Sequence, residues 1–188
     1  MRAGVLALQG DFAAHLAALP AGATEVRTAA AIDALDLLVL PGGESTTMLK
    51  LLDGSGIEEA VRRLVARGGV VFGTCAGAIL LAAEVRGPAQ RSFGLIDVTV
   101  ERNAFGRQVD SFEAVLEPDY PGVFIRAPRI RRVGPGVEVL ARWKGEPVLV
   151  REGRVFAATF HPELTADRRV HGLVVAAVGT AREASAAR

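Results

Sequence analysis

The sequence predicts an α/β protein: a three-layer α/β/α sandwich with a mostly parallel central sheet and an antiparallel section in the second half. Three observations support this prediction. In the first half, short apolar runs alternate with helix-like segments, which is the order of parallel β-α-β units. The runs are continuously apolar, as in strands that are covered on both faces. In the second half, β-rich segments follow one another with turn sequences between them, which favours antiparallel pairing.

The first half supplies four predicted strands and four predicted helices. The strands are residues 4–8, 24–27, 37–40 and 70–72, and the helices are residues 12–19, 45–52, 57–66 and 77–85. Three of the strands are continuously apolar and stop at Gly, Pro or a polar residue, as buried strands do. Pro20 ends the first helix, and the hydroxyls of Ser45 and Thr46 are typical caps for the second. The third helix is amphipathic, so we expect it to cover the sheet.

The second half is mostly strand-like between residues 95 and 155. Strands are predicted at residues 96–100, 137–140, 148–150 and 155–159, with turns at residues 134–136 and 151–154. A last helix is predicted at residues 170–182, and the tail from about residue 183 is expected to fray. No repeat, linker or low-complexity segment divides the 188 residues, and one domain has roughly 150 residues. We therefore expect a single domain over residues 1–188.

Composition excludes several classes of function. The 22 Lys and Arg residues nearly balance the 21 Asp and Glu residues, and aromatic residues are only 5% of the chain, so no nucleic-acid-binding surface is expected. No apolar run approaches the ~20 residues of a membrane-spanning helix. The apolar start of the chain stops at Gln9, too early for a signal peptide, so we expect a cytoplasmic protein. A single cysteine excludes an intrachain disulfide and a multi-cysteine metal site, and no metal is expected.

That cysteine, Cys75, lies in the most informative stretch of the sequence. It is placed between a predicted strand and a predicted helix, in a Gly-x-Cys-x-Gly setting formed with Gly73 and Gly77. This pattern is the cysteine version of the nucleophile elbow, a sharp turn that needs small flanking residues. A cysteine at a helix N-terminus is also favoured as the thiolate. The alternative, a small buried cysteine that only fills space, is disfavoured by the two glycines.

A cysteine nucleophile needs a base, and the base needs an orienting group. His161 and Glu163 follow the predicted strand 155–159, and Pro162 between them ends that strand. In a parallel sheet, the carboxyl ends of this strand and of the strand before Cys75 lie at the same edge. We therefore expect His161 to take the thiol proton and Glu163 to hold the other ring nitrogen. The two other histidines, His15 and His171, lie on predicted helices and are expected to be solvated or structural.

The turn after the strand 37–40 is a candidate oxyanion site. Its Pro41-Gly42-Gly43 sequence leaves the backbone free of side chains before a helix. The N–H groups of Gly43 and of Ala76, the residue after the nucleophile, are the expected pair of donors. A phosphate-binding turn is the alternative, but Lys50 is too far along the helix to complete one.

These elements together resemble a known family. The sequences GTCAG (residues 73–77), PGGESTT (residues 41–47) and FHPEL (residues 160–164) are similar to those of class I glutamine amidotransferases. GVLALQGD (residues 4–11), VERNAFGRQ (residues 100–108), SFE (residues 111–113) and FIRAP (residues 124–128) resemble, more narrowly, the glutaminase subunits of pyridoxal 5'-phosphate synthase. The resemblance covers nearly the whole chain in order.

The resemblance implies a fold, a reaction and a set of residues. It implies a class I glutamine amidotransferase-like fold and the hydrolysis of L-glutamine to L-glutamate and ammonia. Ammonia would pass to a synthase subunit that builds pyridoxal 5'-phosphate, in a large hetero-oligomeric complex and with no cofactor on this chain. Cys75, His161 and Glu163 would form the catalytic triad. Glutamine would be bound by Gly43, Glu44, Ser45, Arg102, Ile125 and Arg126. A guanidinium suits the substrate's α-carboxylate, and the carboxylate of Glu44 suits its α-ammonium.

Two stretches depart from the family pattern. Residues 20–31 look shortened and Ala-rich, and Ala78 stands where a larger apolar residue is expected. Neither touches the triad. Three alternative functions remain: another class I glutaminase, such as that of imidazole glycerol phosphate synthesis; a stand-alone cysteine hydrolase; and a catalytically inactive scaffold that only binds the synthase.

Overall fold

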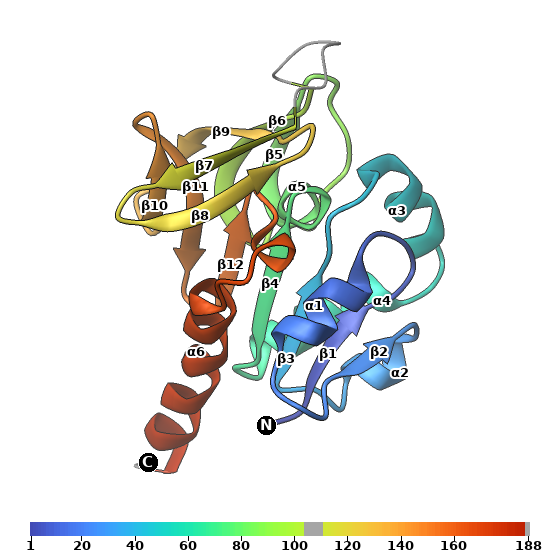
Figure 1. Cartoon of the computed structure of the whole chain (residues 1–188). Helices are drawn as coiled ribbons and strands as arrows, with labels where there is room; N and C mark the ends of the chain where they lie inside the picture. The colour runs from blue at the N-terminus through green and yellow to red at the C-terminus, as the bar shows by residue number, and fades with distance from the viewer. Residues whose placement is uncertain (104–110, 187–188) are drawn as a thin grey trace.

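The computed structural model shows a central twisted sheet with covering layers on both faces (Figure 1). It describes residues 1–103 and 111–186. This is the predicted α/β architecture, with a mostly parallel sheet and an antiparallel section in the second half of the chain. No helix in the described ranges is both long enough and apolar enough to span a membrane.

Among the described residues, the main sheet has seven strands. In spatial order they are β10 (Glu138–Trp143), β11 (Glu146–Glu152), β12 (Val155–Ala158), β4 (Val70–Thr74), β3 (Leu37–Leu40), β1 (Ala3–Leu6) and β2 (Thr24–Val26). From β12 to β2 every neighbouring pair is parallel, whereas β10, β11 and β12 pair antiparallel. The carboxyl ends of β3, β4 and β12 therefore lie side by side at one edge of the sheet.

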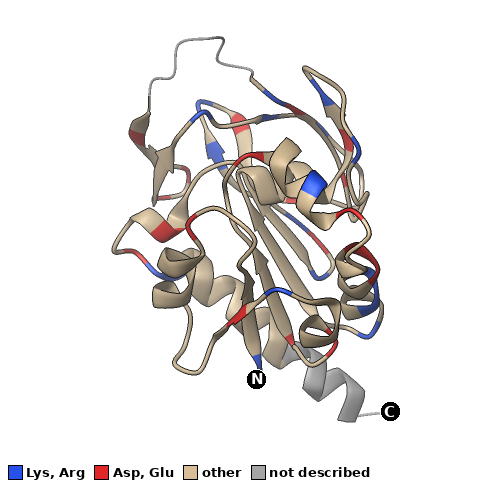
Figure 2. Ribbon diagram, turned by 90° about the vertical axis from the view of Figure 1, so that its right-hand side faces the viewer, with Lys and Arg blue, Asp and Glu red and all other residues tan. Residues whose placement is uncertain are grey.

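Strand β3 shows why these segments form a sheet that is covered on both faces. Its four side chains are all buried, and they alternate between two cores. Leu38 and Leu40 pack into one hydrophobic cluster, and Leu37 and Val39 into the other. Successive side chains of a strand point to opposite faces, so a continuously apolar strand must be covered twice. Figure 2 shows the same pattern by charge: the central strands are free of charged residues, which lie on helices, loops and peripheral strands.

Six helices and two smaller sheets surround the main sheet in the described part of the chain. The helices are α1 (Phe12–Ala18), α2 (Ala29–Ile32), α3 (Ser45–Leu52), α4 (Ile57–Ala66), α5 (Ala76–Leu81) and α6 (Arg169–Ala186), with a 3₁₀ turn, η1 (Pro162–Leu164). One small sheet has the order β5 (Ala82–Arg86), β6 (Ile96–Glu101), β9 (Arg129–Val133), and the other pairs β7 (Phe112–Leu116) with β8 (Tyr120–Phe124). The first core contains side chains of α2 to α5, β5 and β6, and the second contains side chains of α1, α6, β7 and β8.

Several sequence-based expectations about individual elements are wrong. The helix predicted at residues 77–85 ends at Leu81, and the chain enters β5 directly at Ala82. The last helix does not stop at residue 182 but continues to Ala186. Helix α3 is capped by the carboxylate of Glu44, which accepts from the N–H groups of Thr46 and Thr47, and not by hydroxyls of its own first turn. Ser45 instead donates its hydroxyl to the side chain of Gln90.

Candidate active site

Cys75 lies on a tight turn between β4 and α5, as the sequence predicts. Its φ is +46°, a conformation that non-glycine residues rarely adopt. A Cβ on Gly73 would collide with the backbone of Gly77, and a Cβ on Gly77 would collide with the carbonyl of Leu40 in β3. The turn is tied to the neighbouring strand by a 2.8 Å hydrogen bond from the Cys75 N–H to the Ala158 carbonyl. The glycines therefore let the elbow pack against β3 while the cysteine is held at its apex.

His161 and Glu163 are brought to Cys75 by the parallel pairing of β12 with β4. His161 follows β12 and Glu163 lies in η1. The Nδ1 atom of His161 is 2.7 Å from Oε1 of Glu163, and the histidine also hydrogen-bonds to the Cys75 side chain. Since Nδ1 is engaged with the carboxylate, Nε2 is the nitrogen available to the thiol. The order cysteine, imidazole, carboxylate is that of a nucleophilic triad.

The electrostatics of this trio favour an imidazolium beside an ionised carboxylate. Burial lowers the pKa of His161, but its hydrogen bonds to Cys75 and Glu163 outweigh burial and raise that pKa to about 10. Burial raises the pKa of Glu163, but its interactions with His15 and His161 outweigh burial and lower that pKa to about 2. Glu163 is thus a fixed negative charge that stabilises a proton on His161.

Of the two expectations for His15 and His171, solvated or structural, solvation is wrong, because both side chains are buried. His15 lies on the buried face of α1, beside Glu163 and Thr74. The spacing of apolar residues in the sequence indicates burial of His15, because it lies three residues after Phe12 and four before Leu19, on the apolar face of α1.

An open cavity of about 280 Å³ lies over the thiol. Its volume is at the lower end of small-molecule sites, about 300–1,000 Å³, and suits a single amino acid. Cys75, His161 and all six residues predicted to bind the substrate line it, namely Gly43, Glu44, Ser45, Arg102, Ile125 and Arg126. Ala76 and Glu163 are buried and do not line it. Residues that sequence reasoning did not single out also line it: Gly10, Asp11, Ile79, Asn103, Pro128 and Leu164. Residues 104–108 of the VERNAFGRQ stretch lie outside the described residues.

The charged residues of the cavity are organised around the start of α3. The Glu44 carboxylate accepts three hydrogen bonds, from the N–H groups of Thr46 and Thr47 and from the Thr47 hydroxyl. Partial burial raises the pKa of Glu44, but these hydrogen bonds outweigh it and lower that pKa to about 2. Arg102 reaches the same place, with Nη2 3.6 Å from Glu44 Oε1 and 3.1 Å from the Thr46 hydroxyl. Arg126 is exposed at the rim, on a backbone with φ +46°.

The turn after β3 leaves almost no room for side chains. A Cβ on Gly42 would collide with the ring of His161, and a Cβ on Gly10 would collide with the Gly42 carbonyl. Gly43 has φ +147°, and the Gln9 amide donates to the Glu44 carbonyl, 3.0 Å away. Ala76 is the first residue of α5, so its N–H has no acceptor within the helix. Of the two residues predicted to supply oxyanion donors, Gly43 thus lines the cavity together with Cys75, and Ala76 directly follows Cys75 in the chain.

Comparison with known proteins places this geometry in a family. The sequence matches the model of the SNO glutamine amidotransferase family over residues 5–180. "Pyridoxal 5'-phosphate synthase subunit PdxT" of a Thermus thermophilus strain is 57% identical over 177 residues, covering 89% of this chain and 93% of that relative. The subunit of the same name from Koribacter versatilis is 54% identical over 181 residues, covering 92% and 93%.

A solved crystal structure of a glutamine amidotransferase is similar to this chain throughout. It superposes with a TM-score of 0.89 at 52% identity, covering 95% of this chain and 100% of that one. The class I glutamine amidotransferase fold expected from the sequence is thereby confirmed. This chain belongs to the SNO glutamine amidotransferase family.

Proposed function

We propose that this chain is the glutaminase subunit of a pyridoxal 5'-phosphate synthase, in which Cys75, His161 and Glu163 hydrolyse L-glutamine to L-glutamate and ammonia. The observation that supports it most directly is the thiol of Cys75 on a strained turn at the wall of a small cavity, next to an imidazole held 2.7 Å from a buried carboxylate. The relatives named above are synthase subunits by name, and the family is one of glutamine amidotransferases.

The reaction follows from the roles these atoms can take. His161 Nε2 accepts the thiol proton, and Cys75 Sγ attacks the carbon of the substrate's side-chain amide. When the tetrahedral intermediate collapses, the C–N bond breaks and His161 returns the proton to the leaving nitrogen, so that ammonia departs and a thioester remains. His161 then takes a proton from water, which attacks the thioester and releases glutamate and the thiol. Glu163 stabilises the imidazolium in both halves of the reaction.

The negative oxygen of each tetrahedral intermediate needs hydrogen-bond donors directed at it. The N–H groups of Gly43 and Ala76 are the proposed pair, because Gly43 lines the cavity together with Cys75 and Ala76 directly follows Cys75 in the chain. The cavity also suits a zwitterion. Arg102 and Arg126 offer guanidinium groups to the α-carboxylate. The Glu44 carboxylate holds the start of α3 and pairs with Arg102, and its remaining acceptor positions are available to the α-ammonium.

The proposed partner is the synthase subunit that consumes the ammonia, in a large hetero-oligomeric complex. The relatives named above are synthase subunits by name, and the proposed reaction leaves ammonia for such a synthase to use. A cytoplasmic location fits a lone thiol nucleophile, because a reducing compartment keeps it free.

The test uses the complex reconstituted from this chain and its synthase subunit. We expect glutamine-dependent formation of both glutamate and pyridoxal 5'-phosphate, and we expect Cys75→Ala to abolish both. Added ammonium salt should restore product formation, but not glutamate release, in the Cys75→Ala complex, because the synthase itself is intact. Glutamate release by the Cys75→Ala complex at the wild-type rate would contradict the proposal. Failure of the two chains to co-purify would point instead to a different class I glutaminase.

A further inference from the structure

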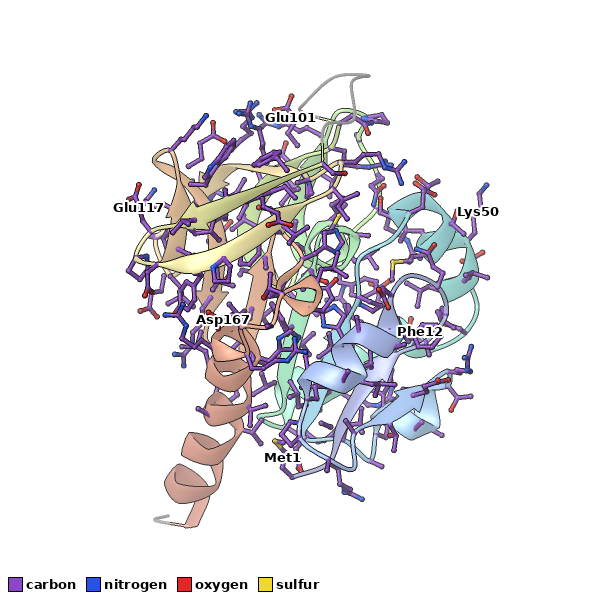
Figure 3. All side chains as sticks on the ribbon, in the orientation of Figure 1. Met1, Phe12, Lys50, Glu101, Glu117 and Asp167 are labelled. Carbon is purple, nitrogen blue, oxygen red and sulfur yellow. The ribbon has the colours of Figure 1, made fainter. Side chains whose placement is uncertain are left out.

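Behind the triad lies a buried polar cluster that the reaction above does not use. It consists of His15 on α1, His171 on α6 and Thr74 at the end of β4, with exposed fractions of 0%, 1% and 0%. In Figure 1, α1, η1 and the start of α6 lie together over the end of β4. In Figure 3, Phe12 marks the start of α1 and Asp167 marks the approach to α6, and side chains fill the space between them. Histidines are rarely fully buried without a specific partner.

The distances link this cluster to the triad in a continuous chain. His15 Nε2 is 3.1 Å from the Thr74 hydroxyl and 3.4 Å from Glu163 Oε2. His15 Nδ1 is 3.0 Å from His171 Nε2. The other oxygen of Glu163, Oε1, is the one that contacts His161. Glu163 therefore has one histidine beside each of its oxygens: Oε1 is hydrogen-bonded to His161, whereas Oε2 faces His15 at ion-pair distance and makes no hydrogen bond of standard geometry among the described residues.

The protons on these rings can be assigned from the acceptors. Glu163 is ionised and only accepts, so His15 must carry its proton on Nε2 to face it favourably. His15 Nδ1 is then an acceptor, and His171 donates to it from Nε2. This leaves His171 Nδ1 as a bare lone pair, in agreement with its having no hydrogen-bond partner among the described residues. A neutral ring with an unpaired acceptor costs less inside a protein than an unpaired N–H of a charged ring.

We propose that His15, oriented by His171, is a positioning residue of the triad: its Nε2–H holds Oε2 of Glu163 so that Oε1 stays directed at His161. The inference rests on the proposed function, because it assigns a role to that triad. Without His15, the carboxylate would keep its buried charge but lose one of its two anchors. It would then turn away from His161 in a fraction of molecules, and the imidazolium would lose its partner.

Few other groups around His15 could hold Oε2 of Glu163. β4 contributes the Thr74 hydroxyl and the ring of Phe72, whose centroid is 6.4 Å from that of His15 and 5.9 Å from that of His171. η1 contributes Glu163, and α6 contributes His171, with exposed Arg168 acting on it from the preceding loop. Phe72 thus packs on both rings without offering a hydrogen bond, which makes it a matched control.

The experiment measures the rate of iodoacetamide alkylation of the isolated, wild-type chain as a function of pH. Cys75 is the single cysteine of the sequence, so the rate reports one thiol and needs neither glutamine nor the partner. The variants are His15→Gln, which keeps an N–H near the position of Nε2, His15→Met, which does not, and Phe72→Leu, which loosens the packing alone. Melting temperatures are measured for all of them.

We expect His15→Met to move the pH of half-maximal alkylation upward, because a less stabilised imidazolium favours the thiolate less. His15→Gln should stay near the wild-type value, and Phe72→Leu should melt earlier with an unchanged pH of half-maximal alkylation. In the reconstituted complex, His15→Met should lower kcat for glutamine about 10-fold or more, as loss of a partner behind an active histidine does at metal sites. KM should change little, since His15 does not line the cavity.

An unchanged alkylation profile in folded His15→Met would overturn the proposal, and so would an equal shift in Phe72→Leu. If His15→Met does not fold, His171→Met and His171→Gln replace the two His15 variants. We then expect His171→Met to raise the pH of half-maximal alkylation and His171→Gln to leave it near the wild-type value, and an unchanged profile in folded His171→Met would overturn the proposal. The alkylation profile tests the positioning role of His15 separately from the proposed glutaminase function. A shifted profile in a chain that hydrolyses no glutamine would contradict the proposed function and leave the positioning role standing.

Discussion

At the scale of single residues, the site combines a buried group that stays charged with a buried group that stays neutral. Glu163 is held ionised because its interactions with His15 and His161 outweigh the effect of burial, and these interactions lower its pKa to about 2. His171 is the opposite case: burial first, and His15 second, lower its pKa from 6.5 to about 4. At neutral pH Glu163 is therefore a fixed negative charge and His171 is a neutral ring, and acid disturbs both.

His171 gives the chain a particular sensitivity to mild acid. In the folded chain the ring stays neutral down to its pKa of about 4, whereas in the unfolded chain it takes a proton below its ordinary pKa of 6.5. The free energy of unfolding should therefore fall as pH drops through this interval, by an amount on the order of 2 kcal/mol. Glu163 adds its own loss only below pH 4.5, its ordinary pKa. Chemical denaturation between pH 4.5 and 6.5 measures the effect, and His171→Gln should flatten the slope. An equal slope in the variant would contradict the assignment.

Which residues of the site could be predicted depends on how much local signal each one carries. Cys75, His161 and Glu163 stand in short turns with Gly or Pro beside them, so the sequence could place them at one sheet edge. His15 has no Gly or Pro beside it, and its spacing from Phe12 and Leu19 indicates only the buried face of α1, not the contact with Glu163. The role of Glu44 as the cap of α3 depends on rotation of a long side chain over the first turn, which residue type alone does not determine.

At the scale of elements, the elbow depends on how closely α5 approaches β3. The contact is backbone to backbone, since a Cβ on Gly77 would collide with the carbonyl of Leu40. Helix α5 has only six residues and is fully buried, so it cannot shift without moving the nucleophile. The strain at Cys75 is supported by this packing.

Gly77→Ala should therefore destabilise the chain and abolish glutamine hydrolysis, although alanine is the better helix former. Gly172→Ala in α6 is the matched control, because a Cβ there meets nothing within 4 Å. It should stabilise the chain by about 0.5–1 kcal/mol and leave activity unchanged. Thermal unfolding and glutamate release measure both variants. Wild-type activity in Gly77→Ala would show that the elbow tolerates a wider separation from β3.

The elements that the sequence predicted correctly include a continuously apolar strand, β3, and a strongly amphipathic helix, α4, whose observed bounds coincide with the predicted ones. The prediction failed at the end of α5, because Ala82, Ala83 and Val85 continue an apolar pattern that suits a helix as well as a strand. What decides between them is tertiary: β5 pairs with β6, a contact that local sequence does not encode. The short helix α2 and the hairpin of β7 and β8 were not predicted for the same reason.

At the scale of the whole molecule, the oxyanion site is the part of the active site whose conformation we expect a docked partner to change. The Gly42–Gly43 turn lines the open cavity, with Gly43 at φ +147° and the Gly42 carbonyl packed against Gly10. A turn of two glycines can rotate its peptide at small cost. We expect docking of the synthase subunit to reorient this turn and complete the oxyanion site.

The isolated chain should accordingly hydrolyse glutamine more slowly than the complex. The loss of one oxyanion donor lowers kcat by about 10²–10³-fold in a comparable acyl transfer, which sets the expected scale of activation. Glutamate release is measured with and without the synthase subunit, at saturating glutamine. Equal kcat values for the two forms would contradict the reorientation.

Strand β5 begins at the residue after helix α5 ends, so the two elements are joined without a flexible segment. From Cys75 the chain runs through α5 into β5 without a loop, and at the far end of β5 the carbonyl of Arg86 accepts the N–H of Arg102 at 2.8 Å. The backbone of Arg102 is thus tied to the far end of a paired strand that begins where the helix of Cys75 ends. The backbone at the nucleophile and the backbone at the proposed carboxylate-binding arginine are therefore held at a fixed separation, and we expect asparagine, one methylene shorter than glutamine, to be hydrolysed more slowly.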